Sequence, residues 1–129
     1  MPTSSKDDTA RPVVLVVEDE PLLRLEAVAL VEEAGFDAVE AGNAFEAIAI
    51  LEQRNDIRVI FTDIQMPGSM DGLRLAHFVR GRWPPIKIIA TSGRAQLRHY
   101  ELPDGGKFIS KPYTRAEVTK ALFELTSEA

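Results

Sequence analysis

Short apolar runs without polar alternation constrain this chain most, because they predict strands that are buried on both faces. The first run, Val13–Val17, contains only valine and leucine, which is typical of a parallel sheet that helices cover on both sides. Four later runs have a similar or weaker strand-like composition. We expect these strands at 37–41, 58–62, 86–90 and 107–110.

Amphipathic segments alternate with the expected strands and predict helices. Pro21 suits the first turn of a helix, and Gly35 suits a left-handed cap at its end. The next two helices are expected at 44–54 and 72–83, and a last helix should follow Thr114. The apolar spacing predicts that the first helix turns toward the core the residues Leu22, Leu25, Val28 and Ala29.

Two of the helix starts carry the spacing of a capping box. Asn43 is followed three residues later by Glu46, and Thr114 is followed in the same way by Glu117. In such a pair, each side chain accepts a hydrogen bond from the backbone of the other residue. Both helices are therefore expected to begin directly after these caps.

The alternation of strands and helices predicts a doubly wound parallel sheet, whose topology the right-handed crossover rule limits. We expect the α/β class and a flavodoxin-like (βα)5 architecture with five parallel strands in the order 2-1-3-4-5. The helix between the fourth and fifth strands is the weakest, because Gly93, Pro103, Gly105 and Gly106 surround it. We expect a short or mobile fourth helix at 95–101.

Length and composition favour one domain. Of the 129 residues, 45% are apolar, and we expect a disordered N-terminal tail at 1–11 and a single domain over 12–129. The net charge of −5 disfavours nucleic acid as a partner, and the absence of cysteine excludes disulfides and thiol chemistry. Because no apolar run reaches the roughly 20 residues of a membrane span, we expect a cytoplasmic protein without a membrane partner.

Reactive side chains follow four of the five expected strands. Glu18 and Asp19 follow the first strand, Asp63 the third, Thr91 the fourth and Lys111 the fifth. The carboxyl ends of parallel strands meet at one edge of a sheet, so these groups should converge. Two like charges about 4 Å apart cost roughly 4 kcal/mol at an effective dielectric near 20, so three carboxylates require a cation. Ligands that are all oxygen favour Mg²⁺.

This combination of groups suits phosphoryl transfer to a carboxylate. Asp63 would accept the group as an aspartyl phosphate, while Lys111 and Thr91 would bind the phosphoryl oxygens. Each signal alone also has an ordinary structural explanation. Acids after a strand favour the N-terminus of the next helix, and threonine has a high strand propensity. The functional interpretation therefore depends on the whole set.

Taken together, four motifs resemble the receiver domain of two-component response regulators. The resemblance extends over roughly Val13 to Leu125 and implies a stand-alone, CheY-like receiver. The motifs are Glu18-Asp19-Glu20-Pro21, Asp63-Ile64-Gln65-Met66-Pro67 with Met70-Asp71-Gly72, Thr91-Ser92-Gly93, and Lys111-Pro112.

The resemblance implies a role for each of these residues in phosphorylation. Asp63 would be the phosphoacceptor, and the backbone carbonyl of Gln65 would be a third protein ligand of Mg²⁺ beside the acidic pair of Glu18 and Asp19. The Asp63 carboxylate would also contact the ion.

The resemblance also implies a switch. Thr91 would be the switch hydroxyl, Lys111 the phosphate partner and Phe108 the rotating aromatic. In such domains the Lys111–Pro112 peptide is often cis. The aromatic here is phenylalanine rather than tyrosine, so it has no hydroxyl to donate a hydrogen bond in either state.

The expected function is a phosphorylation-dependent signalling switch. A phosphohistidine on a sensor histidine kinase or a histidine phosphotransfer protein would supply the phosphoryl group. The domain would signal by binding a downstream protein, or act as a phosphate sink, as a monomer or a phosphorylation-linked dimer. It would catalyse only its own phosphorylation and dephosphorylation. Because the sequence ends shortly after the last helix, we expect no separate output domain.

Three alternatives remain open at this point. A Mg²⁺-dependent aspartyl-phosphate hydrolase would place a second aspartate two positions after the nucleophile, where this chain has Gln65. A flavin-binding module would need a phosphate-binding loop after the first strand, where Glu18, Asp19 and Glu20 would instead repel phosphate. A phosphorylation-independent binding module would not need the complete set of acids, hydroxyl and lysine.

Overall fold

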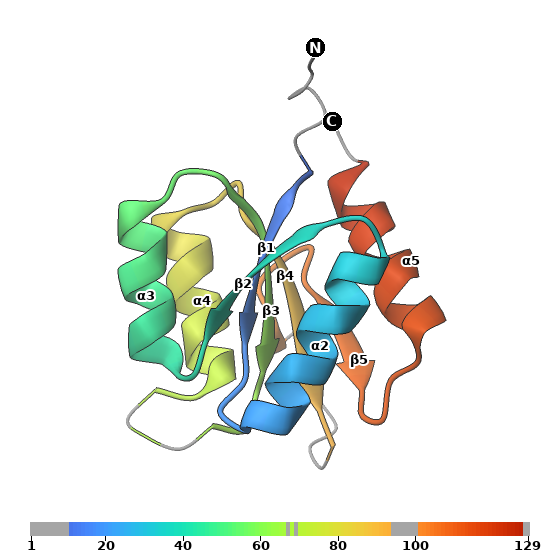
Figure 1. Ribbon diagram of the computed structural model, residues 1–129. Helices are drawn as coiled ribbons and strands as arrows, with labels where there is room; N and C mark the ends of the chain where they lie inside the picture. Colours follow the sequence, from blue (N-terminus) through green and yellow to red (C-terminus); the bar gives the residue numbers. More distant parts are fainter. Residues whose placement is uncertain (1–10, 67, 69, 94–100, 128–129) are drawn as a thin grey trace.

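A five-stranded parallel sheet forms the centre of the protein, with the strands in the order β2-β1-β3-β4-β5 (Figure 1). The computed structural model describes residues 11–66, 68, 70–93 and 101–127. The expected fold class and strand order are confirmed. The strands are β1 (Val13–Val17), β2 (Asp37–Ala41), β3 (Ile57–Asp63), β4 (Lys87–Ser92) and β5 (Lys107–Ser110).

Helices cover both faces of this sheet, as the right-handed crossovers of a doubly wound sandwich require (Figure 1). Helices α3 and α4 lie together on one face, and α2 and α5 lie on the other. These helices are α2 (Pro21–Glu33), α3 (Ala44–Gln53), α4 (Gly72–Arg82) and α5 (Arg115–Thr126).

The central strand β1 shows why the sheet is buried on both faces. All five of its residues are buried. Val13, Leu15 and Val17 belong to the apolar cluster with α3 and α4, while Val14 and Val16 belong to the cluster with α2 and α5. Successive side chains of a strand point to opposite faces, so an apolar residue is needed at every position.

Parallel pairing lengthens the two strands that carry the site. The sequence places strands at 58–62 and 86–90, whereas β3 reaches Asp63 and β4 reaches Ser92. In the β3–β4 register Asp63 lies opposite Thr91. Hydrogen bonds between neighbouring strands therefore extend one to two residues beyond the apolar runs and fix the backbone of both site residues.

The predicted inner face of α2 is wrong for Leu22, Leu25 and Ala29, whereas Val28 does pack against the core. Leu22 and Leu25 are 74% and 62% exposed, while Ala27 and Val31 are buried against the sheet. Leu25 lies two residues before Ala27, which is about 200° around a helix, so the two side chains point in nearly opposite directions. The apolar residues of α2 are numerous enough to fit more than one helical face, and contact with the sheet selects one.

The two predicted caps differ in outcome. Thr114 and Glu117 form the complete reciprocal capping box at the start of α5. Asn43 does accept a hydrogen bond from the Glu46 backbone, but the Glu46 side chain accepts from the Gly42 amide at 2.6 Å rather than from Asn43. Gly35 has the expected positive φ of 101° after α2.

Two expectations fall largely outside the described residues. The disordered tail at 1–11 and the short or mobile fourth helix at 95–101 overlap the described ranges only at their ends, Arg11 and Glu101. Within the described ranges, each helix is too short or too polar to serve as a transmembrane span.

Candidate functional site

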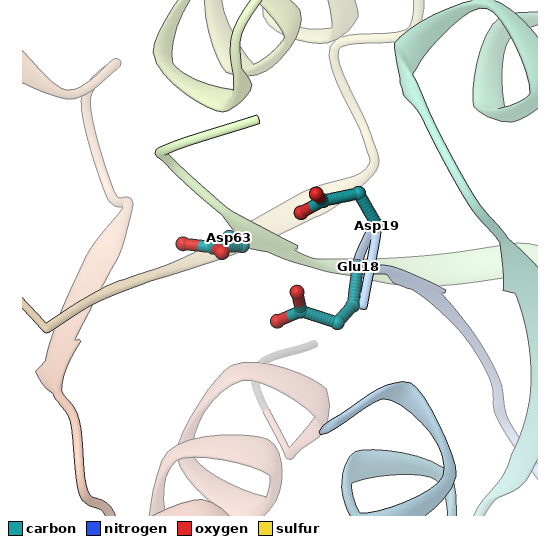
Figure 2. A group of neighbouring side chains, drawn as sticks. All are labelled: Glu18, Asp19 and Asp63. Atoms are coloured by element: carbon teal, nitrogen blue, oxygen red, sulfur yellow. The ribbon is translucent and has the colours of Figure 1, made fainter. Parts of the chain in front are cut away.

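Three carboxylates meet where β1 and β3 end. Glu18 and Asp19 follow β1, Asp63 ends β3, and one oxygen of each lies within 4.8 Å of the others. Figure 2 shows the three side chains leaving neighbouring strand ends toward the same region. Glu18 and Asp63 are buried. Because β1 and β3 are adjacent parallel strands, the expected convergence of the acids is confirmed.

Lys111, directly after β5, reaches the same site. Its Nζ donates to Glu18 Oε1 at 3.0 Å and to Asp63 Oδ2 at 3.1 Å. The backbone leads it there, because the Lys111 amide donates to the Ser92 carbonyl beyond β5. The Lys111–Pro112 peptide is cis. The lysine side chain is 19% exposed, so its ammonium offsets two acids that have little contact with water.

The pKa values of Glu18 and Lys111 are both raised, for different reasons. Burial raises the pKa of Glu18, and the nearby Asp63 adds to this, although Lys111 and the Glu20 amide oppose it. Burial alone would lower the pKa of Lys111, but its bonds and attraction to Glu18 and Asp63 raise the pKa overall. At Glu18, the Lys111 ammonium therefore does not fully offset the effect of burial on the pKa.

The backbone around Asp63 is held from three directions. The Gln65 amide donates to Asp63 Oδ1 at 3.2 Å, and the Ile64 amide donates to the Thr91 carbonyl at 2.9 Å. At the start of α4, the Gly72 amide donates to the Ile64 carbonyl at 2.9 Å. A Cβ atom on Gly72 would overlap the Asp63 carbonyl oxygen, so only glycine permits this approach of α4.

The two expected switch residues lie on the next two strands, Thr91 on β4 and Phe108 on β5. Thr91 is buried opposite Asp63, and Phe108 is half-buried opposite Ala90. Phe108 packs against a small apolar cluster that lies directly behind the site. That cluster consists of Ile64, Ala90 and Leu102, with Leu73 also packed against it.

Gln65 has a second contact that the motif does not predict. Its side-chain oxygen accepts a hydrogen bond from Ser92 Oγ at 3.1 Å, which connects the segment after β3 to the end of β4. Gln65 therefore carries an amide held by a hydroxyl at the position where a hydrolase would carry a second acid. Its backbone carbonyl as a metal ligand stays a prediction.

Arg24 is a site neighbour that no sequence motif indicated. It lies in the first part of α2 and donates from Nη1 to the Glu18 carbonyl at 2.8 Å. The one available signal was a cation near the N-terminus of a helix, where the macrodipole disfavours positive charge.

Comparison with known families decides the identity of the fold and its site. The family model described as the response regulator receiver domain matches residues 14–123. The chain belongs to the response regulator receiver domain family. The match covers all of the residues that form the site, from Glu18 to Lys111.

Curated relatives of this receiver domain are longer proteins. It is 32% identical over 116 residues to the sensor kinase CckA of Brucella abortus, a match that covers 87% of this chain and 12% of that protein. It is 38% identical over 87 residues to the transcriptional regulatory protein AruR of Pseudomonas aeruginosa, covering 64% and 35%. The chain thus spans about a third or less of these two relatives.

Solved receiver structures match along nearly their whole length. A response regulator receiver protein from Sinorhizobium medicae WSM419 is 28% identical with a TM-score of 0.83, and the match covers 92% of this chain and 96% of that one. One from Pseudomonas putida is also 28% identical, with a TM-score of 0.78 and coverage of 89% and 98%. The chain is therefore a receiver domain of phosphorylation-based two-component signalling.

Proposed function

We propose that this receiver is phosphorylated on Asp63 by a phosphohistidine donor and signals through the change that follows. The observation that carries the proposal is the contact of one ammonium group, Lys111 Nζ, with both Glu18 and Asp63. A buried acid beside a second acid and a fixed cation is arranged to gain and hold a dianionic group.

The reaction forms one bond and breaks one. An Asp63 carboxylate oxygen attacks the phosphorus of the donor, the phosphorus–nitrogen bond to the donor imidazole breaks, and the imidazole keeps that electron pair. The product is an aspartyl phosphate. Phosphoryl transfer requires alignment and charge neutralisation more than proton transfer, and the Gln65 amide that binds Asp63 Oδ1 supplies part of this alignment.

The residues present fit Mg²⁺. The three carboxylate oxygens lie within 4.8 Å of one another, and hard oxygen donors of this kind suit a small divalent cation. Glu18, Asp19, Asp63 and the Gln65 carbonyl would hold the ion. When bound, Mg²⁺ would neutralise charge on the phosphoryl oxygens.

Lys111 and Thr91 would bind the phosphoryl group on Asp63. The phosphoryl group adds about −1.5 to −2 charge, so the Lys111 ammonium gains a stronger partner than the Asp63 carboxylate it contacts now. The Thr91 hydroxyl, on the strand beside Asp63, would donate to another phosphoryl oxygen. Movement of Thr91 would release space behind Ala90, where Phe108 packs.

The partner chemistry follows from this reaction. The donor is a sensor histidine kinase or a histidine phosphotransfer protein in the cytoplasm, and the receiver then binds a downstream protein or serves as a phosphate sink. It acts as a monomer or a phosphorylation-linked dimer. Its chemistry is limited to its own phosphorylation and dephosphorylation. Gln65, with its amide bonded to Ser92, disfavours the hydrolase alternative because an amide is no general acid.

Acid-quenched mass spectrometry tests the proposal. The chain is incubated with phosphoramidate and Mg²⁺, and then with hydroxylamine, which cleaves acyl phosphates. We expect a single phosphoryl adduct that hydroxylamine removes and that peptide mapping places on Asp63. An adduct on another residue, or an equal adduct in Asp63→Asn, would contradict the proposal.

A further inference from the structure

Arg24 connects three parts of the molecule behind the acidic pair. Its Nη1 donates to the carbonyl oxygen of Glu18 at 2.8 Å, and its Nε donates to Glu40 Oε1 in β2 at 3.1 Å. The arginine side chain is 23% exposed. A cation so near the start of α2 opposes the helix macrodipole, so these two acceptors must offset that cost.

The acceptor on the β1–α2 turn is a specific peptide group. The Glu18 carbonyl belongs to the peptide that joins Glu18 to Asp19, and peptide groups are planar. Fixing this plane restricts the directions in which both acidic side chains leave the backbone. The preceding peptide is fixed as well, because the Glu18 amide donates to the Ala41 carbonyl at 3.1 Å. Both sides of Glu18 are therefore held against the end of β2.

Gly42 lies beside the guanidinium. A Cβ atom on Gly42 would lie 3.4 Å from Arg24 Nη1 and 3.3 Å from Glu46 Oε1. Glu46 already binds the Gly42 amide at 2.6 Å. The guanidinium thus lies beside the β2–α3 turn, where its planar fork meets two acceptors at once.

We propose that Arg24 is a positioning residue that keeps the Glu18 and Asp19 carboxylates directed at Asp63 and thereby sets the affinity of the site for Mg²⁺. This inference rests on the proposed function. The direction in which Mg²⁺ affinity changes when Arg24 is replaced distinguishes a positioning role from a simple charge effect. A guanidinium near the acids repels a second cation, so loss of its charge alone would tighten Mg²⁺ binding. Loss of positioning weakens it.

Calorimetric titration of the unphosphorylated chain with MgCl₂ tests the inference. We expect Arg24→Gln to raise the Mg²⁺ dissociation constant about 10-fold, within the range typical of residues that orient metal ligands. Arg24→Lys should also raise it several-fold, because one ammonium does not reproduce the planar fork. Glu40→Gln keeps the bond to the Glu18 carbonyl and should have a smaller effect in the same direction.

A control removes a more exposed ion pair elsewhere, in which the arginine side chain is 52% exposed. Arg82→Gln breaks the contact with Glu52 at 3.2 Å between α4 and α3, and it should leave the Mg²⁺ affinity unchanged. Thermal unfolding in EDTA identifies any variant whose fold is weakened, so that the affinities compared are those of equally folded proteins. Arg24→Lys keeps the test decisive if Arg24→Gln unfolds, because it retains the positive charge and removes only the planar fork.

The outcomes separate this inference from the proposed function. Unchanged or tighter Mg²⁺ binding in folded Arg24→Gln would overturn the positioning role while leaving phosphorylation of Asp63 intact. Weaker binding in that variant, together with a wild-type Asp63 that accepts no phosphoryl group, would support the positioning role and overturn the proposed function. Wild-type protein that binds no Mg²⁺ would overturn both the metal site and this role.

Discussion

Lys111 Nζ lies 3.1 Å from Asp63 Oδ2 and 3.0 Å from Glu18 Oε1, so one side chain from the end of β5 connects the ends of β3 and β1. Truncating it leaves two buried acids without this partner. We expect Lys111→Ala to lower the free energy of unfolding by about 2–3 kcal/mol in EDTA, somewhat below the cost of breaking a fully buried pair. Mg²⁺ should restore part of that loss, as measured by urea denaturation.

Lys111→Ala should also separate the phosphorylation of Asp63 from the conformational change at Phe108. Asp63 should still form the acyl phosphate, because its carboxylate is intact, while the amide resonance of Phe108 should no longer shift when beryllofluoride is added. Lys107→Ala is the matched control. Within the described part of the chain, the one ion pair of Lys107 is with the exposed Glu124. A Phe108 shift of wild-type size in Lys111→Ala would show that the lysine does not transmit the change from Asp63 to Phe108.

The raised pKa of Glu18 predicts a pH-dependent stability difference. An acid whose pKa is higher in the folded state carries a penalty that is absent below the unfolded pKa and grows as the pH rises through the folded pKa. Glu18→Gln removes this penalty. Its gain in stability should therefore be near zero at pH 4 and reach, above the folded pKa, about 1.4 kcal/mol for each unit by which the two pKa values differ.

Metal binding should show the complementary pH dependence. A proton on Glu18 competes with a cation, so Mg²⁺ affinity should fall as the pH is lowered through the raised pKa of that carboxyl. Calorimetry at constant ionic strength from pH 4.5, the ordinary value for a glutamate, up to pH 8 measures it. A flat profile over that range would mean that Glu18 does not ligate the ion.

Two glycines of α4 form a matched pair. Gly72→Ala would drive a methyl group into the Asp63 carbonyl, whereas a Cβ atom on Gly81 meets no atom within 4 Å. We expect Gly72→Ala to destabilise the fold by about 1–3 kcal/mol, as overpacking does, and Gly81→Ala to stabilise it by about 0.5–1 kcal/mol. Equal effects in thermal unfolding would show that the close approach of α4 to Asp63 is unimportant.

Two side chains of α4 hold the segment that leads into β5. His77 Nε2 donates to the Glu101 carbonyl at 2.6 Å, and Arg80 Nη1 donates to the Asp104 carbonyl. We expect His77→Ala to speed amide hydrogen exchange across 101–106 while global stability falls by only about 1 kcal/mol. Arg115→Ala, which breaks an exposed contact with Glu33 on the other face, should leave that exchange unchanged.

Local patterns account for the parts of the fold that the sequence predicts correctly. Strands β1, β2 and β5 match their expected bounds, because apolar runs and flanking turns define them without help from other segments. The three acids and Lys111 also follow from local position, since each comes directly after a strand and parallel topology brings strand ends together.

The features that the sequence misses depend on contacts between distant segments. The exposed position of Leu25 is decided by which side of α2 meets the sheet. The hydrogen bond from Arg24 to the Glu18 carbonyl and the bond from Ser92 to Gln65 join segments that only the folded sheet places together. No local sequence pattern predicts these hydrogen bonds.

Beryllofluoride titration followed by amide NMR tests the phosphoacceptor role of Asp63 most directly. In the presence of Mg²⁺, the wild-type domain should show saturable shifts at Thr91, Phe108 and Lys111, and these shifts should be absent in Asp63→Asn and in wild-type protein treated with EDTA. Shifts of equal size in Asp63→Asn, or shifts that do not require Mg²⁺, would contradict the account.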